Sequence, residues 1–272
     1  MIDRTFQLIR TIGPAREKDL WRRGVFTWAD LPENQVTLSE KIDPFLREAI
    51  AKARAALESN DLATLLELLP ARERWRLLPH FAHEAAYLDI ETDGTSDTAE
   101  ITAIGVLHKG QVRSFVNGFN LDDFPAFAEN MKLLVTFNGS CFDVPVLERR
   151  FRGLKLPTAH IDVRFAGRHA GIEGGLKSIE KAMGLERPLH LQGLTGFEAV
   201  RLWRAWRDTG DRAALLVMVE YNLYDAVQLK PVLERVYNRM REVALSGAEP
   251  LPETERGDWL YDLSQQVARF AA

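Results

Sequence analysis

The chain has two regions with different patterns of hydrophobic and polar residues. Residues 1–80 carry apolar residues at helical spacing among Ala, Glu, Lys and Arg, with Pro70 and Pro79 interrupting the runs. Short, unbroken apolar runs begin at Ala85, and such runs are typical of buried strands. We therefore expect a helical N-terminal domain over residues 1–80, followed by a domain that contains a sheet.

The second domain, residues 81–242, has a pattern of five strands. We expect them at 85–90, 101–107, 112–116, 133–137 and 161–165. Lys109 and Gly110 supply a turn, so the first three strands should form a meander. Helical patterns follow at 144–151, 176–183, 197–208 and from Asp211 onward. Strands that first meander and then alternate with helices predict an α/β domain with a mixed sheet.

The two ends of the chain add less. Residues 243–272 have the composition of an acidic linker and tail, with a small helix possible over 259–270. Residues 11–24 resemble a degenerate helix-hairpin-helix element, whose turn offers backbone N–H groups to a DNA phosphate. Thr11 replaces a glycine of that turn, and Pro14 removes a donor. DNA binding and simple packing both stay open for this element.

Composition excludes several classes of protein. The chain has 272 residues, of which 46% are hydrophobic, so it can bury a sizeable core. Its longest apolar run, residues 213–219, has seven residues and is far too short to span a membrane. The first residues lack the pattern of a signal peptide, and the single cysteine, Cys141, excludes an intramolecular disulfide. We expect a cytoplasmic protein without a membrane partner.

The net charge of the chain does not indicate a nucleic-acid partner. The chain carries a net charge of −4 at pH 7, so it needs local basic patches or metal ions to hold a polyanion. The segment from position 149 to position 168 contains six basic residues and a single acid, Asp162. This segment predicts either a phosphate track or a solvated helix face with its loop.

Four acids stand at positions where chemistry is common. Asp89 and Glu91 are two residues apart near a strand end, so their side chains point to the same face. Asp143 follows the buried strand at 133–137, and Tyr221 and Asp225 share a helix face. If the two strands are neighbours, their C-terminal ends bring Asp89, Glu91 and Asp143 together. Taken singly, each acid is better explained as a turn, cap or surface residue, because single-residue motifs match by chance.

A group of carboxylates without cysteine or paired histidines suits a hard cation. Mg²⁺ and Mn²⁺ prefer such oxygen ligands. Two of these ions, about 3.5–4 Å apart, are a common apparatus for hydrolysing phosphodiesters. The acids therefore predict a site for two divalent cations and a nucleic-acid substrate.

The contexts of these acids match one pattern. Residues 87–94 (Tyr-Leu-Asp-Ile-Glu-Thr-Asp-Gly) resemble the first motif of the DEDD, or DnaQ-like, 3′–5′ exonucleases of the ribonuclease H-like superfamily. Residues 137–143, with an Asn before an aromatic-Asp pair, resemble the second motif, and residues 220–225 resemble the third. Residues 160–162 and 175–180 are similar to stretches of the YprB-like branch. That branch usually has His where this chain has Tyr221, so the site is of the Tyr type.

The resemblance implies a fold and a set of roles. The fold is ribonuclease H-like, with a mixed five-stranded sheet flanked by helices, next to the small all-helical N-terminal domain. Asp89 would bridge two cations, Glu91 and Asp225 would complete the first site, and Asp143 would hold the second cation, through water. Tyr221 would orient the attacking water; its reference pKa near 10 makes it a weak base at neutral pH. Substrate contacts are expected from Thr92, Asn138 and Lys177.

The expected substrate is a single-stranded 3′ end of DNA or RNA. Residues His160 and Asp162 are expected to have structural roles. Two rival functions stay open: a non-catalytic nucleic-acid-binding or scaffold protein on the same fold, and a structure-specific endonuclease. The preference between DNA and RNA, the protein partners and the oligomeric state have no signal in the sequence.

Overall fold

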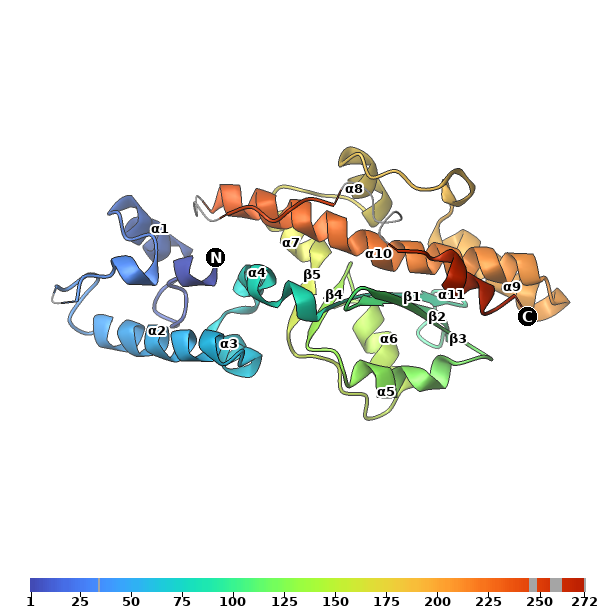
Figure 1. Cartoon of the computed structure of the whole chain (residues 1–272), viewed down its shortest axis with the longest axis horizontal. Helices are drawn as coiled ribbons and strands as arrows, with labels where there is room; N and C mark the ends of the chain where they lie inside the picture. The colour runs from blue at the N-terminus through green and yellow to red at the C-terminus, as the bar shows by residue number, and fades with distance from the viewer. Residues whose placement is uncertain (34, 245–248, 255–260, 272) are drawn as a thin grey trace. The chain divides into compact units, whose positions relative to one another are not determined.

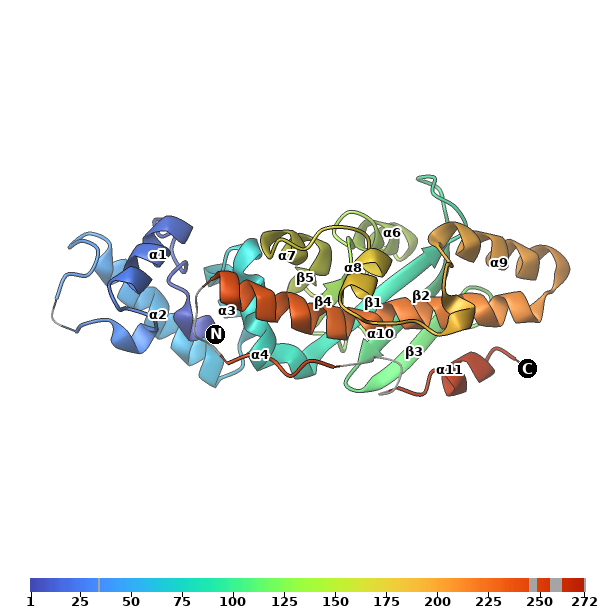
Figure 2. The ribbon, with the colours of Figure 1, turned by 90° about the horizontal axis from the view of Figure 1, so that it is seen from above.

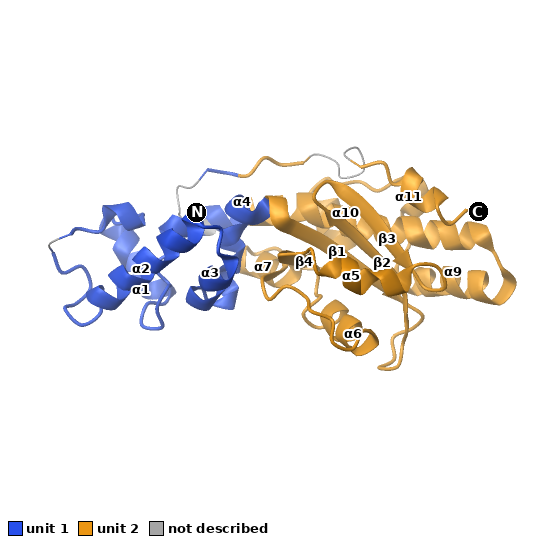
Figure 3. Cartoon of the chain, turned by 60° about the horizontal axis from the view of Figure 1, so that its bottom comes forward, with its two compact units in different colours: residues 1–82, 239–250 blue, residues 83–238, 251–272 orange. Residues whose placement is uncertain are grey.

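The computed structural model describes residues 1–33, 35–244, 249–254 and 261–271. It divides into two compact units, Met1–Ala82 with Arg239–Pro250 and His83–Asn238 with Leu251–Ala272 (Figure 3). We call them the first and the second unit. Across the described ranges, no helix combines the length and the hydropathy needed to cross a membrane.

The first unit is helical. Its α-helices are α1 (Pro14–Arg22), α2 (Asp43–Glu58), α3 (Leu62–Leu68) and α4 (Leu78–Phe81). Short 3-10 helices lie at Ile2–Arg4, Trp28–Asp30 and Ala71–Leu77. Pro79, which the sequence pattern placed at the end of a helix, lies in the first turn of α4. The first turn tolerates proline because its N–H groups have no partner within the helix. Before residue 11 the only helix is Ile2–Arg4.

A buried ionic cluster holds the first unit together. The Glu17 carboxylate accepts hydrogen bonds from Thr5 Oγ1 at 2.7 Å, Gln7 Nε2 at 2.8 Å and Arg76 Nη2 at 3.0 Å. Arg76 also donates from Nε to Glu73 Oε2 at 2.8 Å. Glu17 and Arg76 are each 2% exposed. Every charge in this cluster therefore faces an opposite charge or a hydrogen-bond donor.

The second unit is built on one five-stranded sheet with strand order β3-β2-β1-β4-β5. The strands are β1 (Ala85–Thr92), β2 (Ile101–His108), β3 (Gln111–Val116), β4 (Leu133–Thr136) and β5 (His160–Asp162). β1, β2 and β3 pair antiparallel, whereas β4 runs parallel to β1 and β5 parallel to β4. This mixed sheet, with its helices, confirms the expected α/β fold.

Helices cover both faces of the sheet. They are α5 (Phe124–Ala128), α6 (Asp143–Arg150), α7 (Val163–His169), α8 (Leu176–Ala182), α9 (Gly196–Thr209), α10 (Arg212–Val243) and α11 (Ser264–Ala268). Further 3-10 helices are Ala82–Glu84, Leu121–Asp123 and Leu189–Leu191. The long helix α10 runs along one face of the sheet, and α5 and α6 lie on the other (Figures 1 and 2). The helix α8 lies beside α10 in both views.

The structure corrects two expectations about element boundaries. The strand expected at 161–165 ends at Asp162, and residues 163–165 are helical. Asp162 causes this change, because its carboxylate accepts a hydrogen bond from Arg164 N at 3.2 Å and caps α7. The helix expected over 259–270 is the shorter α11. Residues 259 and 260, and residues 245–248 of the expected linker, lie outside the described residues.

Candidate metal centre

Strand β1 separates core residues from chemical ones by simple alternation. Ala86, Leu88 and Ile90 belong to the apolar core cluster that also contains Phe124 of α5 and Leu147 of α6. Successive side chains of a strand point to opposite faces. Asp89 and Glu91 therefore point to the other face of the sheet, which α10 covers. The pattern that buries the core thus places two carboxylates under a helix.

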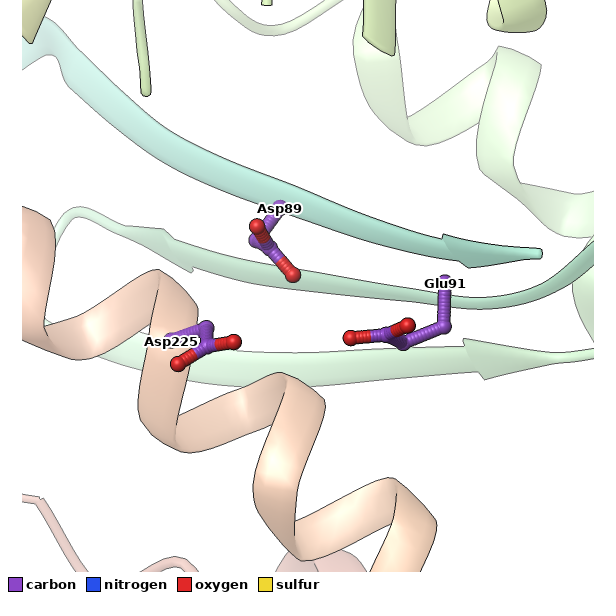
Figure 4. A group of neighbouring side chains, drawn as sticks. All are labelled: Asp89, Glu91 and Asp225. Carbon is purple, nitrogen blue, oxygen red and sulfur yellow. The ribbon is translucent and has the colours of Figure 1, made fainter. Parts of the chain in front are cut away.

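Helix α10 brings the third carboxylate. One carboxylate oxygen each from Asp89, Glu91 and Asp225 lies within 4.8 Å of the others. Figure 4 shows Asp89 and Glu91 on the strand and Asp225 on the helix, with their carboxylates turned toward one another. Glu91 and Asp225 are buried, and Asp89 is half-buried. Two acids of one strand and a third acid more than 100 residues further along the chain therefore offer oxygen ligands to one point.

Asn222 ties helix and strand together at this point. Its amide Nδ2 donates to Asp89 Oδ2 at 2.9 Å and to the Asp89 carbonyl oxygen at 3.1 Å. Gly105 of β2 is paired with Asp89 and makes this close packing possible. A Cβ atom at position 105 would lie 2.9 Å from the backbone oxygen of Asn222, too close for any other residue.

Asp143 lies apart from this group, at the start of α6. Its buried carboxylate accepts a hydrogen bond from the backbone N–H of Ile90, between the two acids of β1. Burial raises the pKa of Asp143 to about 7, and the charge of Asp162 adds to the rise. The structure thus brings the second motif against the first, with its acid at the edge of the three-carboxylate group.

The turn before Asp143 is held by Asp162. This carboxylate accepts hydrogen bonds from Asn138 N at 2.8 Å and from Ser140 N at 3.0 Å. Asn138 has a φ of +64°, a conformation that asparagine tolerates better than most residues. His160 contributes nearby, with Nε2 2.8 Å from Thr136 Oγ1. These contacts fit the structural roles expected for His160 and Asp162.

The crowded acids are electrostatically frustrated. Burial, together with the charges of Asp225, Glu91 and Asp143, raises the pKa of Asp89 well above its usual range. Burial and the charge of Asp225 do the same to the pKa of Glu91. Lys177 lowers both values, without cancelling the rise. A cation at this point would relieve the repulsion.

Tyr221 and Lys177 meet beside Asp225. The Lys177 ammonium donates a hydrogen bond to the Tyr221 hydroxyl oxygen and lies 3.4 Å from Asp225 Oδ2. Burial and the charge of Asp225 raise the pKa of the Tyr221 phenol far above its usual range. Tyr221 therefore keeps its proton and is a hydrogen-bonding group, not a base.

The other two residues expected to contact substrate already have partners. Thr92 Oγ1 donates to the carbonyl oxygen of Gly94 at 2.7 Å, and Asn138 Oδ1 accepts from Arg164 Nη1 at 2.8 Å. The basic segment 149–168 is divided between α6 with its loop and α7. Arg149 and Arg150 bond the carbonyl oxygen of Ala99 and the carboxylate of Asp122.

Sequence reasoning missed three residues that the structure places around the acids. Asn222 lay inside the third motif, and Glu180 inside the stretch 175–180, but neither had an assigned role. Arg187 had no motif; it contacts Asp225 Oδ1 and forms a pair with Glu180. The spacing of Lys177 and Glu180 on one helix face was the available signal for Glu180.

Comparisons with known proteins place these features in a family. No curated protein matches the chain. Its fold is similar to the family B DNA polymerase from the hyperthermophilic archaeon Pyrobaculum calidifontis, with 16% sequence identity and a TM-score of 0.43. That match covers 59% of this chain and 27% of the polymerase chain. A model of the RNase_H superfamily matches residues 86–237, which hold all of the sheet but its first residue, and every acid of the candidate centre. The chain belongs to the RNase_H superfamily.

Proposed function

We propose that this chain is a metal-dependent 3′–5′ exonuclease of the DEDD type, with the tyrosine form of the third motif and a YprB-like ancestry. Membership in the RNase_H superfamily suggests a nuclease. One observation carries the finer proposal: Asp89, Glu91 and Asp225 converge within 4.8 Å, with Asp143 against the same strand. Convergence of the first and third motifs on one point, with the acid of the second motif against the same strand, supports a shared catalytic role.

The residues present fit a pair of divalent cations. All ligands on offer are carboxylate oxygens, the donors that Mg²⁺ and Mn²⁺ prefer. The raised pKa values of Asp89 and Glu91 give the group a reason to bind cations. Asp89, Glu91 and Asp225 would hold one ion, and Asp143 would share a second with Asp89. Such ions, when bound, activate water and stabilise the charge of the scissile phosphate and its leaving oxygen.

The chain's own residues orient the reaction. Because Lys177 donates to the Tyr221 oxygen, the phenol proton stays available for donation to a water or a phosphate oxygen. Tyr221 therefore positions the attacking water and does not deprotonate it. Thr92, Asn138 and Lys177 are proposed to contact the 3′-terminal nucleotides after exchanging their present partners.

One assay tests this function against its rivals. The full chain is incubated with Mn²⁺ and a 5′-labelled single strand, as DNA in one reaction and RNA in another. We expect a ladder of progressively shortened labelled products from at least one strand. A single internal cut would replace the proposal by an endonuclease. An intact strand with retarded migration would replace it by a binding protein.

A further inference from the structure

Arg187 lies in the loop after α8 and is clamped by a glutamate from that helix. Its Nε donates to Glu180 Oε2 at 2.7 Å, and its Nη2 donates to Glu180 Oε1 at 2.6 Å. Glu180 is 1% exposed and Arg187 is 8% exposed. Two parallel hydrogen bonds of this kind fix the guanidinium plane as well as its position.

The same guanidinium reaches the metal centre. Nη2 also contacts Oδ1 of Asp225, the helix α10 acid of the three-carboxylate group. The guanidinium carbon lies 5.4 Å from the ring centroid of Tyr224 and 5.9 Å from that of Tyr221. Tyr224 in turn donates from its hydroxyl to the carbonyl oxygen of Glu186 at 3.1 Å. The loop is thereby attached to α10 at two successive residues, Glu186 and Arg187.

The charges explain why this arrangement is compatible with metal binding. An arginine placed alone beside Asp225 would neutralise the carboxylate and compete with a cation. Here Glu180 balances the charge of Arg187, so the negative charge of Asp225 stays available. Arg187 contacts one oxygen of Asp225, Oδ1, and leaves the other, Oδ2, which lies 3.4 Å from the ammonium of the more exposed Lys177.

We propose that Arg187, held by Glu180, is a positioning residue that sets the orientation of Asp225 for cation binding. This inference rests on the proposed function, since it takes Asp225 as a metal ligand. Partners of ligands commonly contribute about 10–100-fold to metal affinity or activity. The pair gives α8 and its loop a purpose that the motif of residues 175–180 left open.

A buried ion pair also has a simpler explanation, in which it only stabilises the fold. A double variant separates the two roles, because replacing both partners of a buried pair by apolar residues leaves neither of them buried without the other. Asp225 loses the contact with Arg187 and keeps Lys177, 3.4 Å from its Oδ2. Arg187→Met with Glu180→Met keeps the volume of both side chains and removes the contact to Asp225. The matched control is Arg207→Met, which removes an exposed arginine paired with Asp208 on α9.

Mn²⁺ affinity of the full chain, measured by isothermal titration calorimetry without substrate, is the main readout. We expect the double variant to melt near the wild-type temperature and to bind Mn²⁺ about 10–100-fold more weakly. Arg207→Met should bind like wild type. Single-turnover cleavage of the labelled strand should slow in the double variant, while its affinity for the strand in chelator stays unchanged. Wild-type Mn²⁺ affinity in the folded double variant would overturn the proposal.

Arg187→Lys provides a second test that does not depend on the double variant folding. Lysine keeps the charge opposite Glu180 but lacks the planar fork that reaches two carboxylates. A positioning role predicts weakened Mn²⁺ binding in this variant, whereas a purely structural charge pair predicts full rescue. Wild type that binds Mn²⁺ but cleaves no strand would refute the exonuclease alone. Wild type that binds no Mn²⁺ would refute both proposals.

Discussion

Each of the two units contains a buried group of charged side chains, and the two groups differ in what surrounds each charge. In the first unit, Glu17 collects donors from Thr5, Gln7 and Arg76, and Arg76 divides its fork between two glutamates. In the second unit, Asp89 and Glu91 face other carboxylates, and burial with those charges raises the pKa of each. In the first group each carboxylate meets donors from the chain itself, whereas in the second group the acids of β1 meet other acids.

This contrast teaches how to distinguish structural burial of charge from functional burial. A satisfied cluster limits the cost of taking ions out of water and specifies one arrangement of the chain. An unsatisfied cluster raises the free energy of the folded protein, so it needs an external partner to offset the cost. The RNase_H superfamily domain carries the unsatisfied group.

The largest effect is expected from Asp89, the first acid of the three-carboxylate group. Asp89→Ala should abolish strand cleavage, because it removes the carboxylate proposed to bind both cations. It should also abolish the rise in melting temperature that Mn²⁺ gives to the wild type, by removing binding to the folded state. Both are read by the labelled-strand assay and by thermal scans with and without Mn²⁺. Cleavage at the wild-type rate would show that the centre lies elsewhere.

In the first unit the corresponding variant should affect stability alone. Arg76→Met leaves Glu17 buried without its cation, while Glu73 keeps Arg72 at 3.5 Å. Loss of one partner of a buried pair costs about 3–5 kcal/mol. Hydrogen exchange of amides in residues 1–82 measures the local free energy of opening. Lys52→Met is the control, since Lys52 and Glu67 form an exposed pair 3.2 Å apart, worth under about 1 kcal/mol. An equal loss in both variants would remove the distinction between the clusters.

The next effect concerns Tyr221. Tyr221→Phe removes the hydroxyl that positions water and should slow single-turnover cleavage about 10²-fold. Mn²⁺ affinity should stay close to that of wild type, because the hydroxyl is not a proposed ligand. Identical single-turnover rates would refute the positioning role.

Tyr221→His sharpens the same test. Imidazole has a reference pKa near 6.5 and is able to act as a base near neutrality. We expect this variant to retain substantial activity and to show a break near neutral pH in its pH–rate profile. A variant as inactive as Tyr221→Ala, with metal and strand binding intact, would mean that α10 does not present residue 221 to the water.

The smallest expected effect is a change in the free energy of unfolding whose sign differs between the two units. Glu91→Gln removes one repelling charge, so in chelator at pH 7 it should raise the free energy of unfolding by about 1 kcal/mol. Glu17→Gln should lower it, because it breaks a satisfied cluster. Denaturation in chelator, followed by hydrogen exchange within each unit, gives both values.

The pH dependence of this stability difference tests whether charge repulsion causes it. The pKa of Glu91 is raised above its ordinary 4.5 in the folded protein, so the folded state binds more protons than the unfolded state above that pH. Wild type should therefore lose stability relative to Glu91→Gln as the pH rises from about 4.5, with no difference below it. A difference that is independent of pH would assign the effect to packing.

Local signals in the sequence predicted most of the sheet. The runs at Ala85 and Leu133 became buried strands, because an unbroken apolar run has few alternatives in a domain of this size. The fifth strand was overextended, since Val163 and Phe165 continue its apolar run. What ends the strand is the side chain of Asp162, which caps the next helix, and capping depends on conformation rather than on hydrophobicity.

The candidate centre was predictable only where its residues belong to contiguous motifs. Asp89 and Glu91 were expected to share a face, and they do. The position of Asp143 at the edge of the group depends on its bond to Ile90, which no spacing reveals. Arg187, in the loop after α8, meets Asp225 of α10, so its role is visible only in three dimensions. The roles of all these residues stay predictions for the experiments above.

The contact between Gly105 and Asn222 has a consequence for how such sequences are classified. Position 105 carries no chemistry, yet a single added methyl group there meets the backbone of α10 at 2.9 Å. The helix would have to shift, and Tyr221 and Asp225 would move with it. A homologue that keeps every motif acid but has alanine at this position would need a different placement of α10 and therefore of Asp225. A search for chains that bring these three carboxylates together therefore needs this glycine as well as the acids.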